Sequence, residues 1–389
     1  MPRLTRLTLT DFRNYAALTW RPQARLAVIS GPNGSGKTNL LEALSLLVPG
    51  RGLRGARIAD LARAGGNGRW GVAARFATDA GALEVATGTA PDGGERRVFR
   101  LDGAAPRNQA EIAARLAVVW LTPRMDRLFQ EAAGGRRRFL DRLVFALEPG
   151  HAREVAAGET ATASRNRLLA EGSRDTAWLA GLEASMARHA VAATVARVSL
   201  VRGLNATLAA GAAAPFPAAR IVLQCPIAAR LAQEPALAVE EWLRGALAAG
   251  RAADAAAGAA RLGAHRADMV LADAASGLEA GLASTGQQKA LLIGLVLGHA
   301  ALIAARLGFP PLLLLDEPAV HLDAARRDAL CAALSRMTAQ ALLTGTDAGV
   351  FAALAGRAEF LHCGGGNLVP EPGFPPPDPG SDPPAALYV

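Results

Sequence analysis

The chain has few cysteines and no paired ones. Its three cysteines, Cys225, Cys331 and Cys363, are scattered through 389 residues, and none belongs to a CxxC pair. An odd number without such spacing excludes a disulfide framework and a cysteine-rich zinc site. The sequence therefore predicts a protein of a reducing compartment.

Long apolar runs are also missing. The first fifteen residues alternate polar and apolar side chains and lack the apolar core and cleavage site of a signal peptide. The 16 residues between Lys289 and Arg306 form an uncharged, almost wholly apolar stretch, which is shorter than the ~18 residues of a membrane span. With 51% hydrophobic and 20% charged residues, the composition suits a folded core. We expect a soluble, cytoplasmic protein that binds no membrane.

Lysine is almost absent. Among 42 basic residues only Lys37 and Lys289 are lysines, and the others are arginines. A lysine in such a chain suggests chemistry that the bulky guanidinium cannot replace. The formal net charge is +8, so the charge balance favours a polyanionic partner such as nucleic acid.

The order of hydrophobic patterns predicts an α/β unit that a helical segment interrupts. Residues 4–10 and 26–31 have the pattern of strands, and a helix follows the glycine-rich segment after the second one. Short alternating segments between 70 and 101 predict antiparallel strands. From about 125 to 210 the apolar spacing is helical. From 284 onward, helices and strands alternate again.

Residues 31–38 read GPNGSGKT and satisfy the GxxxxGK[ST] pattern of a phosphate-binding loop, or P-loop. Glycines let successive N–H groups and the following helix N-terminus face the phosphates. We expect Lys37 to reach the β and γ phosphates of ATP, and the Thr38 hydroxyl to bind Mg²⁺. A glycine-rich turn that matches by chance is the alternative. The expected nucleotide-binding residues are Gly31, Pro32, Asn33, Gly34, Ser35, Gly36, Lys37 and Thr38.

Residues 312–318 read LLLLDEP, an apolar run that ends in two carboxylates, as in a Walker B strand. A buried parallel strand is hydrophobic on both faces, and ligands sit at its carboxyl end. We expect Asp316 to join Thr38 as a metal ligand. Glu317 is expected to orient and polarise the attacking water, which makes it a catalytic residue together with Lys37. Alternatively, the acidic strand end only caps the next helix.

The segment STGQQK at 284–289 opens a helix and resembles the signature motif of ABC-type ATPases, whose usual form is LSGGQ. In that superfamily the motif completes the site of the opposite subunit. The resemblance therefore implies that Ser284, Gly286 and Gln287 contact nucleotide bound by a partner chain. A plain helix N-cap is the alternative. The segment DEPAVHLD at 316–323, which looks like a Walker B joined to a D-loop, favours the signature motif.

Further segments sharpen this resemblance along the chain up to about residue 365. They are DFRNY at 11–15, GRGLR at 50–54, RRRFLDRLVF at 136–145, RNRLL at 165–169, GAHRADM at 263–269, STGQQKALL at 284–292 and TGTD at 344–347. Their order resembles the RecF family, which is similar to the SMC head ATPases but has a short helical lobe instead of a long coiled coil. The resemblance implies ATP-dependent homodimerisation on DNA at single-strand gap boundaries. It also implies help with loading RecA, alongside RecO and RecR.

The expected fold is therefore α/β, a P-loop ABC-type ATPase head with an inserted helical lobe. We expect lobe I from residues 1–115 and 260–365, helical lobe II from 116–259, and a disordered proline-rich tail from 366–389. An ABC transporter ATPase subunit is the alternative. The interval of 247 positions between Lys37 and Ser284 favours a DNA-type head over a transporter subunit.

Several positions stay open in the sequence. Gln109 and Gln130 are both candidates for the glutamine of a Q-loop, and Thr346 stands where transporters have a switch histidine. His265 is either structural or functional. The arginine clusters at 51–57, 63–75 and 136–142 either line a DNA groove or form solvated and packing faces.

Overall fold

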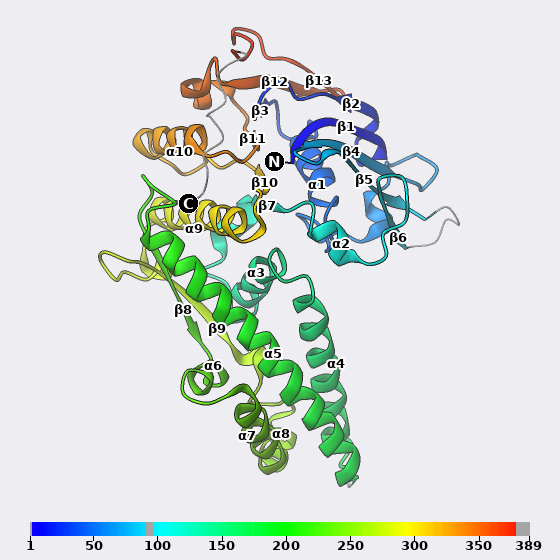
Figure 1. The fold of residues 1–389 in the computed structure, drawn as a ribbon, viewed down its shortest axis with the longest axis vertical. Coiled ribbons are helices and arrows are strands. Elements are labelled where there is room, and N and C mark those ends of the chain that lie inside the picture. The colour runs from blue at the N-terminus through cyan, green and yellow to red at the C-terminus, as the bar shows by residue number, and fades with distance from the viewer. Residues whose placement is uncertain (1, 91–95, 174, 379–389) are drawn as a thin grey trace. The chain divides into compact units, whose positions relative to one another are not determined.

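A computed structural model describes residues 2–90, 96–173 and 175–378 (Figure 1). The chain divides into two compact units. Unit 1 consists of Met1–Asp126, Gly211–Ala218 and Ser284–Val389. Unit 2 consists of Arg127–Ala210 and Ala219–Ala283.

One sheet of unit 1 is antiparallel, with the strand order β2-β1-β4-β5-β6. Its strands are β1 (Arg3–Phe12), β2 (Tyr15–Trp20), β4 (Gly71–Thr78), β5 (Gly81–Thr89) and β6 (Arg97–Leu101). Along β1 the side chains of Leu4, Leu7 and Leu9 are fully buried between more exposed neighbours. This alternation is typical of an antiparallel sheet with one face on the core. The predicted antiparallel strands between 70 and 101 are confirmed.

The second sheet of unit 1 has the order β13-β12-β3-β11-β10-β7 and is parallel except for β13. Its strands are β3 (Leu26–Ser30), β7 (Val118–Leu121), β10 (Leu312–Leu315), β11 (Ala341–Thr344), β12 (Ala358–Gly364) and β13 (Asn367–Pro370). Every residue of β3, β7, β10 and β11 is buried. A parallel sheet covered on both faces requires such predominantly apolar strands.

Helix α1 lies between the two sheets, since it contacts β4 of the first sheet and β7, β10 and β11 of the second. This arrangement places the N-terminus of α1 at the carboxyl ends of the parallel strands, where ligands bind in open α/β sheets. The helical elements of unit 1 are α1 (Lys37–Ser45), η1 (Ile58–Leu61), α2 (Gln109–Ala113), α9 (Thr285–Leu307), α10 (Ala324–Arg336) and η5 (Ala348–Leu354). The short η2 (Pro123–Arg127) follows β7.

Helix α9 is the one described helix that is long and apolar enough to cross a membrane by length and composition. Within the structure, 78% of its apolar window is buried. This burial is typical of a core helix of a folded domain. Lys289, near the start of the helix, is buried in an ion pair. The Nζ atom of Lys289 lies 2.7 and 2.9 Å from the two carboxylate oxygens of Asp126.

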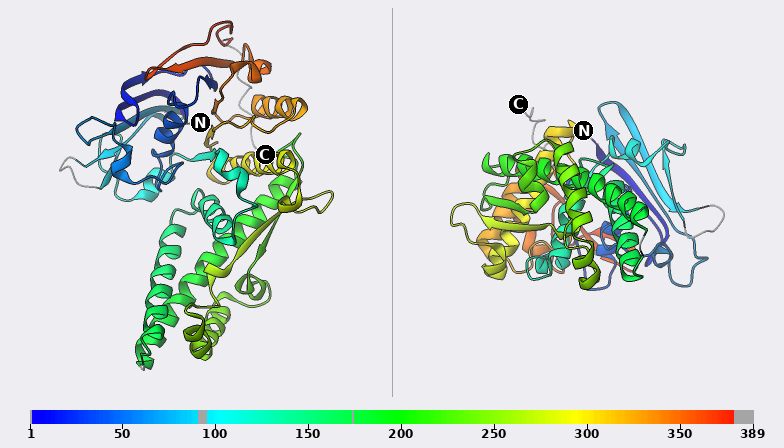
Figure 2. Two further views of the ribbon diagram at one scale, coloured as in Figure 1. Left: turned by 180° about the vertical axis from the view of Figure 1, so that it is seen from behind. Right: turned by 90° about the horizontal axis from the view of Figure 1, so that it is seen from below.

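Unit 2 is mainly helical, and its long helices α4 and α5 run side by side (Figure 2). The helical elements are α3 (Ala133–Phe145), α4 (His151–Ala170), α5 (Thr176–Ala209), α6 (Pro226–Leu231), α7 (Ala236–Ala249), α8 (Arg251–Ala257), η3 (Ala264–Arg266) and η4 (Ala280–Leu282). An antiparallel pair, β8 (Ala219–Gln224) and β9 (Asp268–Asp273), completes the unit.

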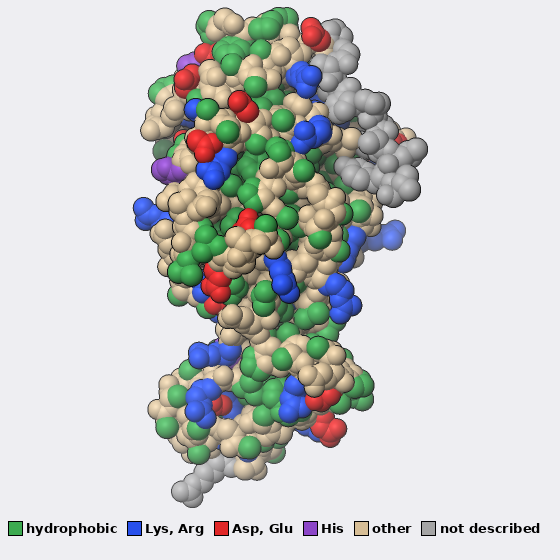
Figure 3. Space-filling model, turned by 90° about the vertical axis from the view of Figure 1, so that its left-hand side faces the viewer, with side chains coloured by type: hydrophobic (Ala, Val, Ile, Leu, Met, Phe, Trp, Pro, Cys, Tyr) green, Lys and Arg blue, Asp and Glu red, His purple; other side chains and the backbone are tan. Residues whose placement is uncertain are grey.

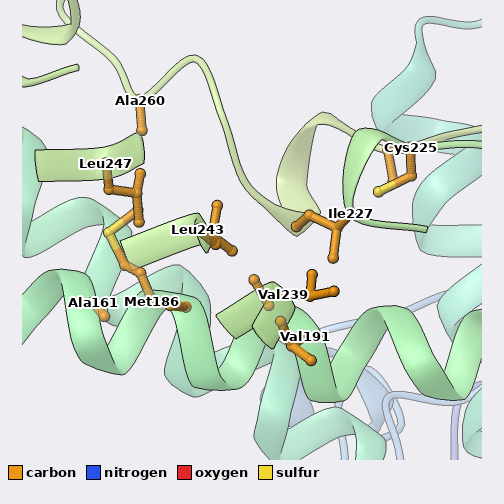
Figure 4. Close-up of a cluster of buried hydrophobic side chains, with 12 residues drawn as sticks. Ala161, Met186, Val191, Cys225, Ile227, Val239, Leu243, Leu247 and Ala260 are labelled. Atoms are coloured by element: carbon orange, nitrogen blue, oxygen red, sulfur yellow. The ribbon is translucent and has the colours of Figure 1, made fainter. Parts of the chain in front are cut away.

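Small and branched apolar side chains from α4, α5, α6 and α7 form a core within unit 2 (Figure 4). Leu243 and Val239 of α7 are fully buried against Met186 and Val191 of α5, and Ala161 comes from α4. The many alanines let these helices approach closely, as dense packing requires. The apolar residues at helical spacing in the sequence therefore form the packed core of unit 2.

A buried ion network lies beside this core. Arg165 of α4 is fully buried and donates to Glu183 of α5 at 3.0 Å, to Asp254 of α8 at 2.8 Å and to the Leu247 carbonyl at 2.7 Å. Burial alone would raise the pKa of Glu183, but hydrogen bonds from Arg251 and Arg165 hold that pKa below its ordinary value. The Glu183 carboxylate is therefore stabilised in its charged form within a largely buried ion network.

The units differ from the expected lobes at their limits. Strand β7 pairs with β10, so unit 1 extends past residue 115, to Asp126. Strand β9 pairs with β8, which brings residues 260–283 into unit 2. The prediction of a disordered tail is wrong for 367–370, because β13 pairs with β12. Residues 379–389 lie outside the described part.

We expect Arg165→Ala to destabilise unit 2 strongly, by about 3–5 kcal/mol, because it removes the fully buried cation that Glu183 and Asp254 share. Urea unfolding followed by circular dichroism would measure the loss. Arg167→Ala is the matched control, since Arg167 is exposed on the same helix and its removal should change stability by less than about 0.5 kcal/mol. Equal effects of the two variants would contradict the ion network.

Candidate nucleotide and magnesium site

The loop at 31–38 joins β3 to α1 and adopts a conformation that requires glycine. The φ angles of Gly31, Gly34 and Gly36 are +142°, +82° and +116°. A Cβ atom on Gly31 would lie 2.5 Å from the carbonyl oxygen of Cys363, and one on Gly36 would lie 2.5 Å from Nδ2 of Asn14. Two of the three glycines are thus fixed by close packing as well as by backbone angle.

The turn between β1 and β2 supports this loop, which the sequence did not reveal. Asn14 donates from Nδ2 to the carbonyl of Ser35 at 3.0 Å, and the Tyr15 hydroxyl donates to the carbonyl of Gly36 at 3.0 Å. Burial raises the pKa of Tyr15, so it stays a neutral donor. The DFRNY motif carried these residues, but nothing in its spacing pointed to the loop.

Polar groups of the loop fit a phosphate-bearing ligand. Lys37 is buried, and its ammonium donates to the carbonyls of Gly31 at 2.6 Å and Pro32 at 2.9 Å. The buried hydroxyl of Ser35 has no hydrogen-bond partner among the described residues. Open space surrounds Gly34, and Pro32 and Asn33 are exposed. The loop therefore gathers a cation, an unpaired donor and the start of α1, with open space at Gly34.

The carboxyl end of β10 holds Asp316 against the first turn of α1. Asp316 Oδ1 accepts from Thr38 Oγ1 at 3.0 Å and from Thr344 Oγ1 at 2.8 Å, and the Asp316 side chain is buried. No group of three His, Cys, Asp or Glu side chains that could hold a metal occurs among the described residues. A hydroxyl and one carboxylate are nevertheless what Mg²⁺ takes from a protein when phosphates and water supply its other ligands.

Glu317 is held in an uncommon backbone conformation. Its φ angle is +48°, and its N–H donates to Thr344 Oγ1 at 3.0 Å. Thr344 thus links the two adjacent carboxylate residues through a single hydroxyl. Thr344 is fully buried at the end of β11, whereas Thr346, which stands where transporters have a switch histidine, is exposed two residues further on.

Gln109 and Gln130 are the two candidates for a Q-loop glutamine. Neither is among the hydrogen-bond partners of Asp316 and Glu317 in the described residues. Gln109 is the exposed first residue of α2, and Gln130 follows η2. The residue that follows β7, next to the end of β10, is the buried Thr122.

Ser284 and Gln287 form a capping box at the start of α9. The Ser284 hydroxyl accepts from the Gln287 N–H at 3.4 Å, and Gln287 Oε1 accepts from the Ser284 N–H at 3.0 Å. Both residues are exposed. A Cβ on Gly286 would lie 3.3 Å from the carbonyl of His321, so the D-loop lies against this helix start. The structure therefore gives the segment the N-cap geometry, and it leaves the two side chains accessible.

Several arginines near the loop are paired with carboxylates. Arg13 binds both carboxylate oxygens of the buried Glu42 at 2.8 Å, and Arg54 reaches Glu42 at 3.1 Å. Arg63 pairs with Asp11 at 2.7 Å. On the face shown in Figure 3, basic side chains are scattered rather than gathered, and several lie beside acidic ones.

In unit 2 the RRRFLDRLVF and GAHRADM segments meet. Arg136 binds both carboxylate oxygens of Asp268, at 2.8 and 2.7 Å, and Arg137 donates to the Ala267 carbonyl. His265 Nε2 lies 2.9 Å from the Ala260 carbonyl, and burial lowers the pKa of His265. These contacts are structural, so the cluster at 136–142 is in part a packing face.

A family model described as "RecF/RecN/SMC N terminal domain" matches residues 3–358. The DNA replication and repair protein RecF of Mesorhizobium japonicum is 48% identical over 370 residues, which cover 94% of this chain and 97% of that protein. The chain belongs to the RecF family. The RecF protein of Agrobacterium fabrum is 46% identical over 371 residues, which cover 94% of this chain and 98% of that protein.

Solved structures agree with the RecF fold. A structure of the recombination mediator protein RecF with ATP in the RecFOR pathway has a TM-score of 0.80 at 20% identity, covering 95% of this chain and 98% of that one. An Smc head domain from Pyrococcus furiosus has a TM-score of 0.52 at 17% identity, covering 95% of this chain and 96% of that one. The expected P-loop ABC-type ATPase head with an inserted helical lobe is confirmed.

We expect Thr344→Val to destabilise this RecF-family protein by about 1–3 kcal/mol, because a buried carboxylate and a backbone N–H lose their shared hydroxyl. Thermal and urea unfolding would measure the change. Thr346→Val, two residues on and exposed, should stay within about 0.5 kcal/mol of the unaltered chain. If the two variants proved equally stable, the hydroxyl of Thr344 would not hold the strand ends.

Proposed function

We propose that this protein is an ATP-dependent DNA-binding protein of recombinational repair. The observation that carries the proposal is the meeting of the P-loop with Asp316, Thr38 and Thr344 at the carboxyl ends of β3, β10 and β11. Family membership points the same way, because the relatives are DNA replication and repair proteins and one solved neighbour is a RecF with ATP.

ATP and Mg²⁺ are the proposed ligands. The N–H groups of the loop and the open space around Gly34 suit the phosphates, and Lys37 would exchange its two carbonyl partners for phosphate oxygens. Ser35 gains the partner that its buried hydroxyl lacks. Thr38 and Asp316 are the proposed metal ligands. When bound, the metal neutralises charge on the phosphates.

Glu317 is the proposed general base that orients the attacking water. Its backbone is held at the end of β10 by Thr344, so its position does not depend on ATP. Removal of the carboxylate charge leaves Asp316 and Thr38 in place. We propose that turnover is slow and DNA-stimulated, because one chain supplies only half of each site.

The other half is proposed to come from a second copy of the chain. The exposed Ser284 and Gln287, together with Gly286, form an accessible helix start whose N–H groups suit a phosphate. An ATP-dependent homodimer would bury this surface. Val320 of the D-loop is exposed, with a relative accessibility of 43%, which supports an interface there.

DNA at single-strand gap boundaries is the proposed polyanion, in line with a net charge of +8. One neighbour is described as belonging to a RecFOR pathway, which supports RecO and RecR as partners and RecA as the protein loaded with their help. The cytoplasm is the proposed location.

Glu317→Gln should bind ATP and Mg²⁺ but hydrolyse ATP at least about 100-fold more slowly, since general-base catalysis contributes about 10²–10⁴-fold. The trapped nucleotide should increase the dimer seen by light scattering. Lys37→Arg is the contrasting variant: it should lose ATP-dependent DNA binding, because a planar fork cannot replace the compact ammonium. ATP-stimulated DNA binding that survives in Lys37→Arg would defeat the P-loop assignment.

A mixing experiment tests the shared site. Lys37→Arg and Ser284→Arg chains should each be inactive alone. Mixed, they should form some heterodimers in which one site is intact, and these should hydrolyse ATP at up to about half the normal rate per dimer if the sites act independently.

Crosslinking provides the control, because it counts the heterodimers that form. A mixture that stays inactive although heterodimers form would mean that both sites must close together or that residues 284–289 have another role. Normal hydrolysis by the Ser284→Arg chain alone would rule out the signature assignment.

A further inference from the structure

A cavity of about 280 Å³ lies in unit 1 near the C-terminal end of α1. Leu46 and Gly50, from the segment that continues α1, line it. Arg51, Arg57 and Arg97 also line it, and none of its lining residues carries a carboxylate. A cavity with three guanidinium groups and no acid suits an anion.

Arg97 is the inner group of this cavity. Its guanidinium donates to the carbonyl of Val48 at 3.4 Å and lies 4.5 Å from the ring centroid of Phe99. Burial lowers the pKa of Arg97 to about 10, which an anion beside it would raise again. None of Arg51, Arg57 and Arg97 forms an ion pair with a carboxylate of the described residues.

Neighbouring arginines behave differently. Arg54, in the same loop as Arg51 and Arg57, is occupied by Glu42 and by Asn39, whose Oδ1 lies 2.5 Å from its Nη1. Arg63 is paired with Asp11. Within this loop, Arg54 is therefore bound within the fold, whereas Arg51 and Arg57 have donors available for a ligand.

We propose that Arg51, Arg57 and Arg97 form a binding site for a phosphate group, separate from the P-loop. Planar guanidinium groups bind phosphate oxygens in pairs, which matches this residue choice. At 1.5 Å per residue, α1 separates its last residue, Ser45, from Lys37 by about 12 Å, so the phosphates of a P-loop nucleotide do not fill the cavity.

The phosphate could belong to a nucleic acid backbone or to a small free anion, and both present the same oxygens. A nucleic acid backbone as the source rests on the proposed DNA binding, whereas a small free anion does not. Two measurements on the full chain separate them.

The first measurement is duplex DNA binding by fluorescence anisotropy across a salt series. Arg97→Gln and Arg57→Gln should each flatten the slope of log K against log salt by roughly one. Arg57 is exposed, so its variant folds even if Arg97→Gln does not. Arg100→Gln is the matched control: Arg100 is exposed on the same strand, three residues along, and does not line this cavity.

The second measurement is the thermal shift caused by inorganic phosphate, compared with chloride at equal ionic strength and with ADP saturating the P-loop. Phosphate should raise Tm in the unaltered chain and in Arg100→Gln, but not in Arg57→Gln or Arg97→Gln.

A changed salt slope assigns the site to a DNA phosphate, and a phosphate-dependent Tm without a changed slope assigns it to a small anion. If the variants match the control in both measurements, the site is overturned. If the unaltered chain binds no DNA, the proposed function fails, and the phosphate arm alone decides the site.

Discussion

The buried carboxylate of Asp316 is the constraint on which the rest of unit 1 depends. A desolvated carboxylate must be hydrogen-bonded, and here its donors come from Thr38 at the start of α1 and Thr344 at the end of β11. These residues are nearly 280 and 28 positions away in the chain. The requirement fixes the ends of β10 and β11 relative to α1, and therefore fixes the P-loop beside Glu317.

Unit 2 is organised by a different kind of buried charge. Its alanine-rich helices pack closely, but Arg165 and Arg197 are among the largest fully buried side chains of the protein. Arg197 binds both carboxylate oxygens of Asp141, at 2.7 and 2.9 Å, and the carbonyl of Ala264. Each arginine joins elements distant in sequence, so the helical unit gains a defined arrangement that alanine contacts alone would leave less specific.

Some arginines of this protein form ion pairs that stabilise the fold, and others are available to a polyanion. The net charge does not distinguish the two groups. Arg13, Arg54 and Arg165 are paired with buried carboxylates, whereas Arg51 and Arg57 form no ion pair with a carboxylate of the described residues. The near absence of lysine adds to this, because the buried Lys289 is committed to Asp126 and only Lys37 lies in the P-loop. Basic composition therefore favours a polyanion, but ion pairing determines which residues are available to it.

The sequence by itself determined the fold class and the parts of the site that are local in the chain. The P-loop is eight consecutive residues whose glycines set backbone angles, and LLLLDEP is an apolar strand followed directly by its carboxylates. Both patterns predict their structures because the backbone angles and burial that define them depend on residues within one continuous segment. Only the tertiary structure decided that Thr344 donates to Asp316, that Asn14 and Tyr15 hold the P-loop, and that residues 260–283 belong with unit 2. Those outcomes depend on strand pairing and side-chain contacts between distant segments, and no local pattern encodes them.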